Sequence, residues 1–191
     1  MLEKLPSALG RALRGVRSDL ASIVYNDASL AQVPSSLIIE SEAFADGAPL
    51  PARYTADAEG LSPPLRWRDG PPHAAELVLL VEDPDAPMPH PLVHAIVWGL
   101  RGGRGAIAEG ALSGAGQRAA SAPLGRNSLL THRYLPPDPP AGHGVHRYAF
   151  QLFALDSPVH FEKPPGRGVV LECLRRHAIA RGLLIGSYQR P

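Results

Sequence analysis

The chain has 191 residues, a length typical of one domain, and 45% of them are apolar, so a buried core is feasible. The net charge of +1 gives no general case for binding nucleic acid, and a single cysteine excludes an intramolecular disulfide. No run of about 18 apolar residues occurs and no secretory signal pattern opens the chain, so we expect a cytoplasmic protein without a transmembrane segment.

The first 24 residues carry the pattern of an amphipathic helix. Gly10 and Gly15 each weaken such a helix by roughly 1 kcal/mol relative to alanine, so it needs a surface to pack on. Three surfaces could receive the helix: its own domain, a second subunit or a membrane surface. The small number of arginines in the segment favours the membrane surface least. A homodimer in which the helix covers the partner is the oligomer we expect. The apolar stripe recurs every three or four residues and consists of Leu2, Leu5, Leu9, Leu13, Val16, Leu20 and Ile23.

After a polar linker that ends near residue 35, short apolar runs alternate with turns rich in proline and glycine. Frequent turns between short strands favour a β-sandwich or barrel. The expected elements are strands at 37–39, 77–82, 93–100, 146–155 and 183–188, an extended segment at 62–67, loops over 101–145, and a helix over 168–182.

The strand at 77–82 ends in the sequence Asp83-Pro84-Asp85-Ala86-Pro87. Two prolines fix the backbone and remove hydrogen-bond donors, which predicts a stiff turn that presents two carboxylates. The strand at 93–100 follows this turn. Because side chains alternate along a strand, we expect His94 to share a face with Ile96, Trp98 and Leu100.

A second histidine opens the strand at 146–155, again after a turn rich in proline. By the same alternation His146, Tyr148, Phe150 and Leu152 share one face. Each of two apolar strand faces therefore begins with a histidine.

These motifs resemble the phosphatidylethanolamine-binding protein family, including its bacterial branch described as Raf-kinase-inhibitor-like. The resemblance rests on DPDAP at 83–87, the histidine that opens the next strand, and the pattern PP-x-G-x-G-x-HRY at 139–148. Further matching segments are 54–67, 125–128 and 184–188. The resemblance runs from about Ser36 to the end, which divides the chain into a helical extension with linker, 1–35, and one domain, 36–191.

The resemblance implies an antiparallel β-sandwich with a few helices and a small pocket at one end of the sheets. It implies a non-catalytic protein without a cofactor that binds a small anionic group such as phosphate, a phosphoethanolamine-like headgroup or a carboxylate. Some family members act on a partner protein such as a kinase or a protease. The pocket residues that it implies are Asp83, His94, Pro139, Pro140, His146 and Tyr148.

The residues themselves support an anion pocket. Two imidazoles and a tyrosine hydroxyl offer several donors, and a neighbouring carboxylate favours the charged form of an imidazole. We add Gly142 to the site, because glycine lets backbone N–H groups approach an anion closely. The chain departs from the bacterial pattern at Pro91-Leu92-Val93, where an aromatic residue usually precedes the histidine, and at Asp138, where a cysteine often stands.

Two other kinds of chemistry are supported by fewer features of the sequence. A metal site has no familiar zinc spacing to support it, although His143 and His146 with Asp83 and Asp85 supply suitable side-chain types. A hydrolase triad lacks a G-x-S-x-G setting at Ser62, Ser121 or Ser128, and Cys173 is expected to be a small core residue. The main alternative function is an enzyme that acts on a small phosphorylated or carboxylated substrate in the same pocket, with His94 or His146 as general acid or base.

Overall fold

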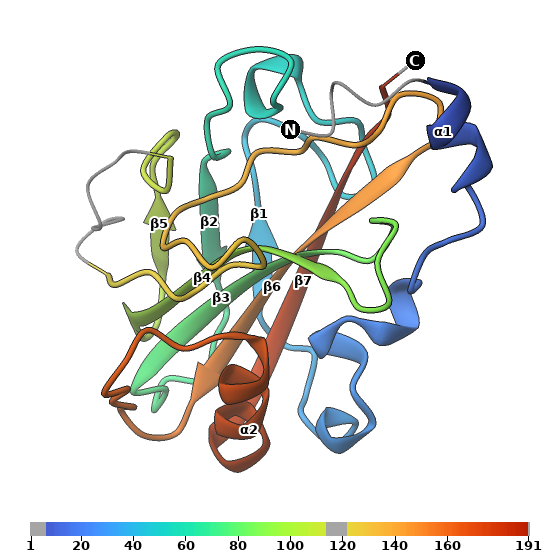
Figure 1. Cartoon of the computed structure of the whole chain (residues 1–191). Coiled ribbons are helices and arrows are strands. Elements are labelled where there is room, and N and C mark those ends of the chain that lie inside the picture. The colour runs from blue at the N-terminus through green and yellow to red at the C-terminus, as the bar shows by residue number, and fades with distance from the viewer. Residues whose placement is uncertain (1–6, 114–121, 191) are drawn as a thin grey trace.

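The computed structural model describes residues 7–113 and 122–190 of the chain. Short 3-10 helices lie at Leu20–Ser22, Val24–Asn26, Ala28–Leu30 and Ala52–Tyr54. The α-helices are α1 (Ser7–Ala12) and α2 (Arg167–His177), and the strands are β1 (Ile38–Glu40), β2 (Leu65–Arg68), β3 (Glu76–Asp83), β4 (Leu92–Arg101), β5 (Gly105–Ile107), β6 (His146–Leu155) and β7 (Ala178–Tyr188) (Figure 1).

The strands form two antiparallel sheets. The larger sheet has the order β4-β3-β6-β7 and the smaller has the order β1-β2-β5. These sheets confirm a mainly β fold with few helices. The predicted strands at 77–82, 93–100 and 146–155 correspond to β3, β4 and β6, whose continuous apolar runs place them at the centre of the fold.

Two clusters of buried side chains cover the two faces of the larger sheet. The inner core joins both sheets and contains, for example, Trp67 of β2, Leu79 of β3 and Phe150 of β6. The helix-side core lies on the opposite face and contains Leu80 of β3 and Leu174 of α2. Figure 1 shows α2 against one end of the larger sheet. No helix within residues 7–113 and 122–190 is long and apolar enough to cross a membrane.

The predicted helix over residues 1–24 is wrong over residues 13–24. Leu2 and Leu5 lie outside the described residues, α1 ends at Ala12, and a turn follows. The helix ends early because the backbone groups after it bond to distant loops, and because Asp19 adopts a φ of 69°. The apolar stripe is split: Leu9 and Val16 are 43% and 44% exposed, whereas Ile23 is fully buried.

The segment predicted as a polar linker packs on the domain. Val24 and Leu30 belong to the helix-side core. The backbone N–H of Val24 donates to the buried carboxylate of Glu82, and the guanidinium of Arg181 lies 4.5 Å from the centre of the Tyr25 ring. This segment is therefore held by specific contacts with β3 and β7.

The predicted C-terminal helix is also too long. It ends at His177, and β7 begins at Ala178, so residues 178–182 are strand and not helix. Burial alternates along β7, with Ala180 and Leu184 on the buried face, which is the period of a strand. Pairing with all of β6 outweighs the local helical pattern. The short strand β5 was likewise missed within the predicted loop over 101–145.

The predicted face of His94 is wrong because β4 contains two bulges. Val81 pairs with Ala95 and Glu82 with Val93, so His94 is an extra residue opposite β3. The second bulge falls near Gly99, which has a φ of 67°. The bulges place Ile96 and Trp98 in the helix-side core, whereas His94 contacts Tyr148 of the inner core.

Candidate ligand-binding site

The turn after β3 is organised by Asp83. Its Oδ1 accepts hydrogen bonds from the backbone N–H groups of Asp85 and Ala86, at 2.8 and 3.1 Å. Its Oδ2 lies 2.7 Å from Nδ1 of His146 at the start of β6. Asp83 and His146 are both buried, so this carboxylate and imidazole satisfy each other away from water.

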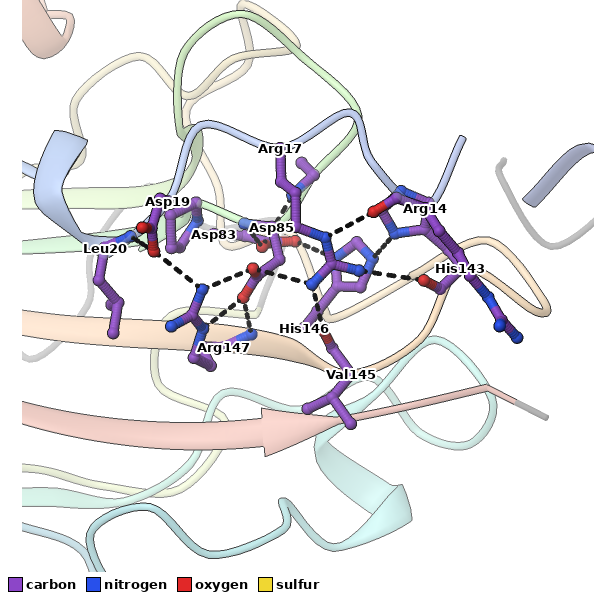
Figure 2. Close-up of polar contacts among 12 residues, drawn as sticks. Arg14, Arg17, Asp19, Leu20, Asp83, Asp85, His143, Val145, His146 and Arg147 are labelled. Atoms are coloured by element: carbon purple, nitrogen blue, oxygen red, sulfur yellow. Dashed lines mark hydrogen bonds and ion pairs between the residues drawn. The ribbon is translucent and has the colours of Figure 1, made fainter. Parts of the chain in front are cut away.

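Asp85 points away from Asp83 and toward two arginines. Its carboxylate is fully buried and accepts hydrogen bonds from the backbone and guanidinium of Arg147 and from Arg17 (Figure 2). Although burial opposes ionisation, the hydrogen bonds from Arg147 lower the pKa of Asp85 below its usual value. The two carboxylates of the turn are therefore held in separate networks, and Asp85 serves to fix the turn.

His143 joins the site although the sequence analysis did not include it in the pocket. Its Nδ1 lies 2.7 Å from Nε2 of His146, and its Nε2 lies 2.8 Å from the backbone oxygen of Leu13. Both imidazoles are buried. Both nitrogens of His146 are thus occupied by protein groups. The pair of histidines three residues apart was the only local signal for this contact.

His94 has a different environment. Its Nδ1 donates to the backbone oxygen of Leu135 at 2.6 Å, and its ring meets the Tyr148 ring edge-on with 5.2 Å between centres. Burial lowers the pKa of His94, so the ring is neutral and Nε2 carries a lone pair. Burial also raises the pKa of Tyr148, which keeps its hydroxyl protonated. Neither Nε2 of His94 nor the Tyr148 hydroxyl has a hydrogen-bond partner among the described residues.

A cavity of about 450 Å³ lies beside His94. Its polar side chains are His94, Arg133 and Asp138. Its apolar lining comes from Ala56, Ala86, Pro87, Met88, Leu92, Leu129, Leu135 and Pro136. A larger groove of about 690 Å³ lies along the smaller sheet, but it contains none of these histidines, so the chemistry favours the smaller cavity.

The remaining predicted site residues line the loop before β6. Pro139 and Pro140 are buried, and the Pro139 oxygen accepts from Arg190, which also pairs with Asp138 at 2.9 Å. Gly142 has a φ of 76°, and a Cβ there would lie 2.8 Å from the Ser7 oxygen, so α1 covers it. The structure thus joins Asp83 to His146 and His94 to Tyr148, while Gly142 lies beneath the N-terminal segment.

The described residues hold no cluster of three His, Cys, Asp or Glu side chains with the geometry of a metal site. The polar groups of the site are instead arranged as hydrogen-bond donors and acceptors. Chemically, the His94 side offers one buried acceptor and one buried donor, and the His146 side offers none that is free.

Known proteins share this fold and these motifs. A family model described as "Phosphatidylethanolamine-binding protein" matches residues 40–189. A UPF0098 protein of Methanothermobacter thermautotrophicus is 36% identical over 152 residues, which are 80% of this chain and 98% of that relative. The UPF0098 protein Mb1945c of Mycobacterium bovis is 38% identical over 167 residues, 84% of this chain and 75% of that one.

A solved structure agrees with the sequence matches. CT736 of Chlamydia trachomatis, described as a homologue of phosphatidylethanolamine-binding protein, is 34% identical to this chain. The superposition covers 82% of this chain and 99% of CT736 with a TM-score of 0.73. The residues that contact His143 from the N-terminal side precede the match to the family model, which begins at residue 40.

Proposed function

Because the chain belongs to the phosphatidylethanolamine-binding protein family, we propose that it is a non-catalytic binding protein whose cavity beside His94 takes a small anionic group. The observation that carries this proposal is a pair of buried, unpartnered polar atoms: Nε2 of His94, which lines the cavity, and the hydroxyl of Tyr148, whose ring meets that of His94. A buried polar atom without a hydrogen-bond partner destabilises the folded protein. A ligand that supplies the missing partners removes this penalty, which favours its binding.

The two atoms also specify the form of the anion. Nε2 of neutral His94 accepts a hydrogen bond, whereas the hydroxyl of Tyr148 donates one. A phosphate group that still carries one proton matches both, because its P–OH donates and its other oxygens accept. A protonated carboxylate matches in the same way. Alternatively His94 takes up the proton itself. Above its second pKa of about 6 a phosphate monoester carries no proton, so its binding consumes about one proton by either route, whereas inorganic phosphate already carries a P–OH at neutral pH and needs none by the first route.

The cavity walls favour a ligand with an apolar part next to its anionic group. Met88, Leu92 and Leu129 are among the side chains that supply the apolar lining, and the guanidinium of Arg133 provides positive charge. A volume of about 450 Å³ suits a headgroup with a short substituent. Inorganic phosphate, O-phosphoethanolamine and acetate are therefore the first probes.

Titration calorimetry in two buffers of different ionisation enthalpy tests the proposal. Phosphate and O-phosphoethanolamine should bind, O-phosphoethanolamine with about one proton taken up per site at about pH 8, and His94→Ala should abolish the heat of binding. His177→Ala is the matched control, because His177 pairs with Asp156 at the surface, far along the chain from the cavity residues. Equal affinity in the wild type and His94→Ala would contradict the site.

Catalysis in the same cavity is the competing proposal, with His94 or His146 as general acid or base. The surroundings of the nucleophile candidates support binding instead. Burial raises the pKa of Cys173 to about 11, and the hydroxyls of Ser62 and Ser128 accept backbone N–H groups. Ser121 lies outside the described residues. Turnover of simple esters or phosphoesters that is lost in His94→Ala would favour the enzyme.

A protein partner such as a kinase or a protease is a further proposal. It is supported by the loop at 127–131, which Asn127 fixes through hydrogen bonds from the backbone N–H groups of Leu129 and Thr131. The loop holds Leu129 and Leu130 at 53% and 72% exposure, and Leu130 has a φ of 60°. A rigid, exposed pair of leucines beside the cavity suits a protein contact. Leu130→Ser should weaken inhibition of any target enzyme without changing phosphate binding.

Three expectations from the sequence remain proposals. We propose that residues 1–35 are an extension of a domain over 36–191, that the protein is a homodimer, and that it is cytoplasmic. The exposed Leu9 and Val16 support a second surface at the N-terminus, and light scattering of Leu9→Ser with Val16→Ser tests the dimer. A 39% identical relative of Mycobacterium tuberculosis has the provisional name lipoprotein LppC, so cell fractionation is the measurement that decides location.

A further inference from the structure

Residues 13–19, which we call the strap, cross the loops on either side of His143 and His146 (Figure 2). On one side, Ser18 and Asp19 donate their backbone N–H groups to the oxygen of Pro84 in the turn after β3, at 2.9 and 3.2 Å. On the other side, Nε of Arg14 donates to the oxygen of Gly142 at 2.8 Å. The strap therefore clamps the turn after β3 to the loop before β6.

Arg17 fastens the middle of the strap. Its guanidinium lies 3.1 Å from the buried carboxylate of Asp85 and also donates to the backbone oxygens of His143 and Val145. Figure 2 shows this side chain reaching between the turn and the loop. Burial raises the pKa of Asp85, but the hydrogen bonds from Arg147 outweigh burial and lower it, so the carboxylate is ionised near neutral pH. Arginine side chains are protonated in the same range. This fastening does not change between pH 5 and 8.

A second fastening does depend on protons. Three contacts run in series from Asp83 through His146 and His143 to the oxygen of Leu13, at 2.7, 2.7 and 2.8 Å. Each contact needs one hydrogen between its two heavy atoms. A carboxylate supplies none, the Leu13 carbonyl supplies none, and two neutral imidazoles supply one each. All three hydrogen bonds form together only when the two imidazoles carry one additional proton between them.

The additional proton belongs on His146. Burial lowers the pKa of His143, and the carboxylate that faces the pair, Asp83, lies directly against His146. His146 then donates Nδ1–H to Asp83 and Nε2–H to His143, and neutral His143 donates Nε2–H to Leu13. Oδ1 of Asp83 accepts two backbone N–H groups, an arrangement that suits an ionised carboxylate.

Loss of that proton leaves one contact with two lone pairs facing each other. The bond between His146 and Asp83 persists, because a charged acceptor holds its hydrogen most strongly. The two buried rings cannot separate, whereas the strap lies at the surface and can. The contact between His143 and Leu13 is therefore the one that breaks.

We infer that residues 13–19 form a proton-controlled latch, which is closed while the His143–His146 pair carries one positive charge and is loosened when that charge is lost. Histidine is the side chain whose change of charge most often controls switches between about pH 5 and 8. Because the strap holds the turn whose far end, Ala86 to Met88, lines the cavity, loosening the latch also weakens the support of one cavity wall, although the contact of Arg17 with Asp85 persists.

Several other charged or titratable groups face the pair. Burial lowers the pKa of His94, the neighbour on β4, which favours its neutral form. The groups that face the two imidazoles are Asp83 and Asp85 from β3 and its turn, Arg14, Arg17 and Asp19 from the strap, Arg147 from β6, and His94 from β4.

Amide hydrogen exchange of the full chain tests the latch. The protection factors of the Ser18 and Asp19 amides, which bond to Pro84, should fall about tenfold from about pH 5.5 to about pH 8, the effect of losing one hydrogen bond. The amide of Val170 in α2 is the internal reference and should not change. Equal protection of the strap at both pH values would overturn the inference.

Two substitutions make opposite predictions. In Asp83→Asn the amide supplies a hydrogen to Nδ1 of His146, so the series closes with two neutral imidazoles and the strap stays protected at both pH values. In His143→Ala the contact with Leu13 is absent, so protection is low at both pH values. An Asp83→Asn protein that follows the wild-type pH dependence would overturn the inference. Should Asp83→Asn not fold, persistence of the pH dependence in His143→Ala would do the same.

Discussion

His94 and His146 occupy similar places in the sequence, each at the beginning of a strand after a turn rich in proline, and yet the structure gives them different tasks. Both nitrogens of His146 contact protein groups, Asp83 on one side and His143 on the other. His94 uses one nitrogen for the Leu135 oxygen and leaves the other without a partner among the described residues. The difference teaches that the contacts of the second ring nitrogen separate the two histidines: His146 bridges two protein groups, whereas the second nitrogen of His94 is the one that we propose for a ligand.

The largest effect that would sharpen this comparison is on stability. His146→Ala leaves the buried carboxylate of Asp83 without its partner, and we expect the free energy of unfolding to fall by about 3–5 kcal/mol. Urea denaturation measures it. The matched control is His177→Ala, which removes an exposed pair with Asp156 and should cost far less than His146→Ala. Similar losses in both proteins would mean that the buried pair contributes little to the fold.

A smaller effect concerns the change in the free energy of unfolding at acidic pH. The pKa of Asp85 is lowered in the folded protein: burial raises it, but the hydrogen bonds from Arg147 outweigh burial. A lowered carboxyl pKa stabilises the fold above the unfolded value of about 3.9, and this contribution is lost as the pH falls below it. Asp85→Asn should therefore cost about 1–3 kcal/mol at pH 7 and less at pH 3.

The measurement is the free energy of unfolding of wild type and Asp85→Asn at the two pH values. Glu172→Gln is the control, because Glu172 pairs with Arg175 and Arg176 on the exposed side of α2. A constant difference between wild type and Asp85→Asn from pH 7 to pH 3 would mean that the pKa of Asp85 is not lowered in the folded protein. It would also contradict the role of Asp85 in fixing the turn.

The sequence predicts one of the two histidine environments better than the other. The apolar runs of β3 and β6 and the strand period correctly place His146 beside Tyr148 and Phe150 on one face. The same period fails for His94, because bulges in β4 turn it from Ile96 toward Tyr148. A bulge depends on pairing with another strand, and local periodicity contains no information about it.

The N-terminal segment was beyond prediction for a similar reason. Its apolar spacing predicts a long helix, but Arg14 bonds to Gly142 and Leu13 to His143, contacts between residues about 130 positions apart. Such long-range polar contacts replace the hydrogen bonds that a helix would make. Helix propensity in β7 was overridden in the same way, by pairing with β6.

The smallest effect on stability, and the most specific test of the His94 side, is expected from Tyr148→Phe. The hydroxyl of Tyr148 is buried and has no partner among the described residues, so removing it relieves an unpaired polar group. We expect the free energy of unfolding to stay within about 1 kcal/mol of wild type or to rise, because the phenyl ring keeps its contact with His94.

The same substitution should weaken the binding of phosphate about tenfold, because one donor to the anion is lost, the equivalent of one hydrogen bond. Calorimetric titration and urea denaturation of one protein sample measure both effects. Tyr134→Phe is the matched control: Tyr134 is also a buried tyrosine of the inner core, whereas the ring that meets His94 is that of Tyr148. A clear loss of stability in Tyr148→Phe with unchanged affinity would mean that the hydroxyl bonds within the protein. Tyr148 would then belong with His146 among the groups that hold the fold, and His94 would be left as the single polar contact for a ligand.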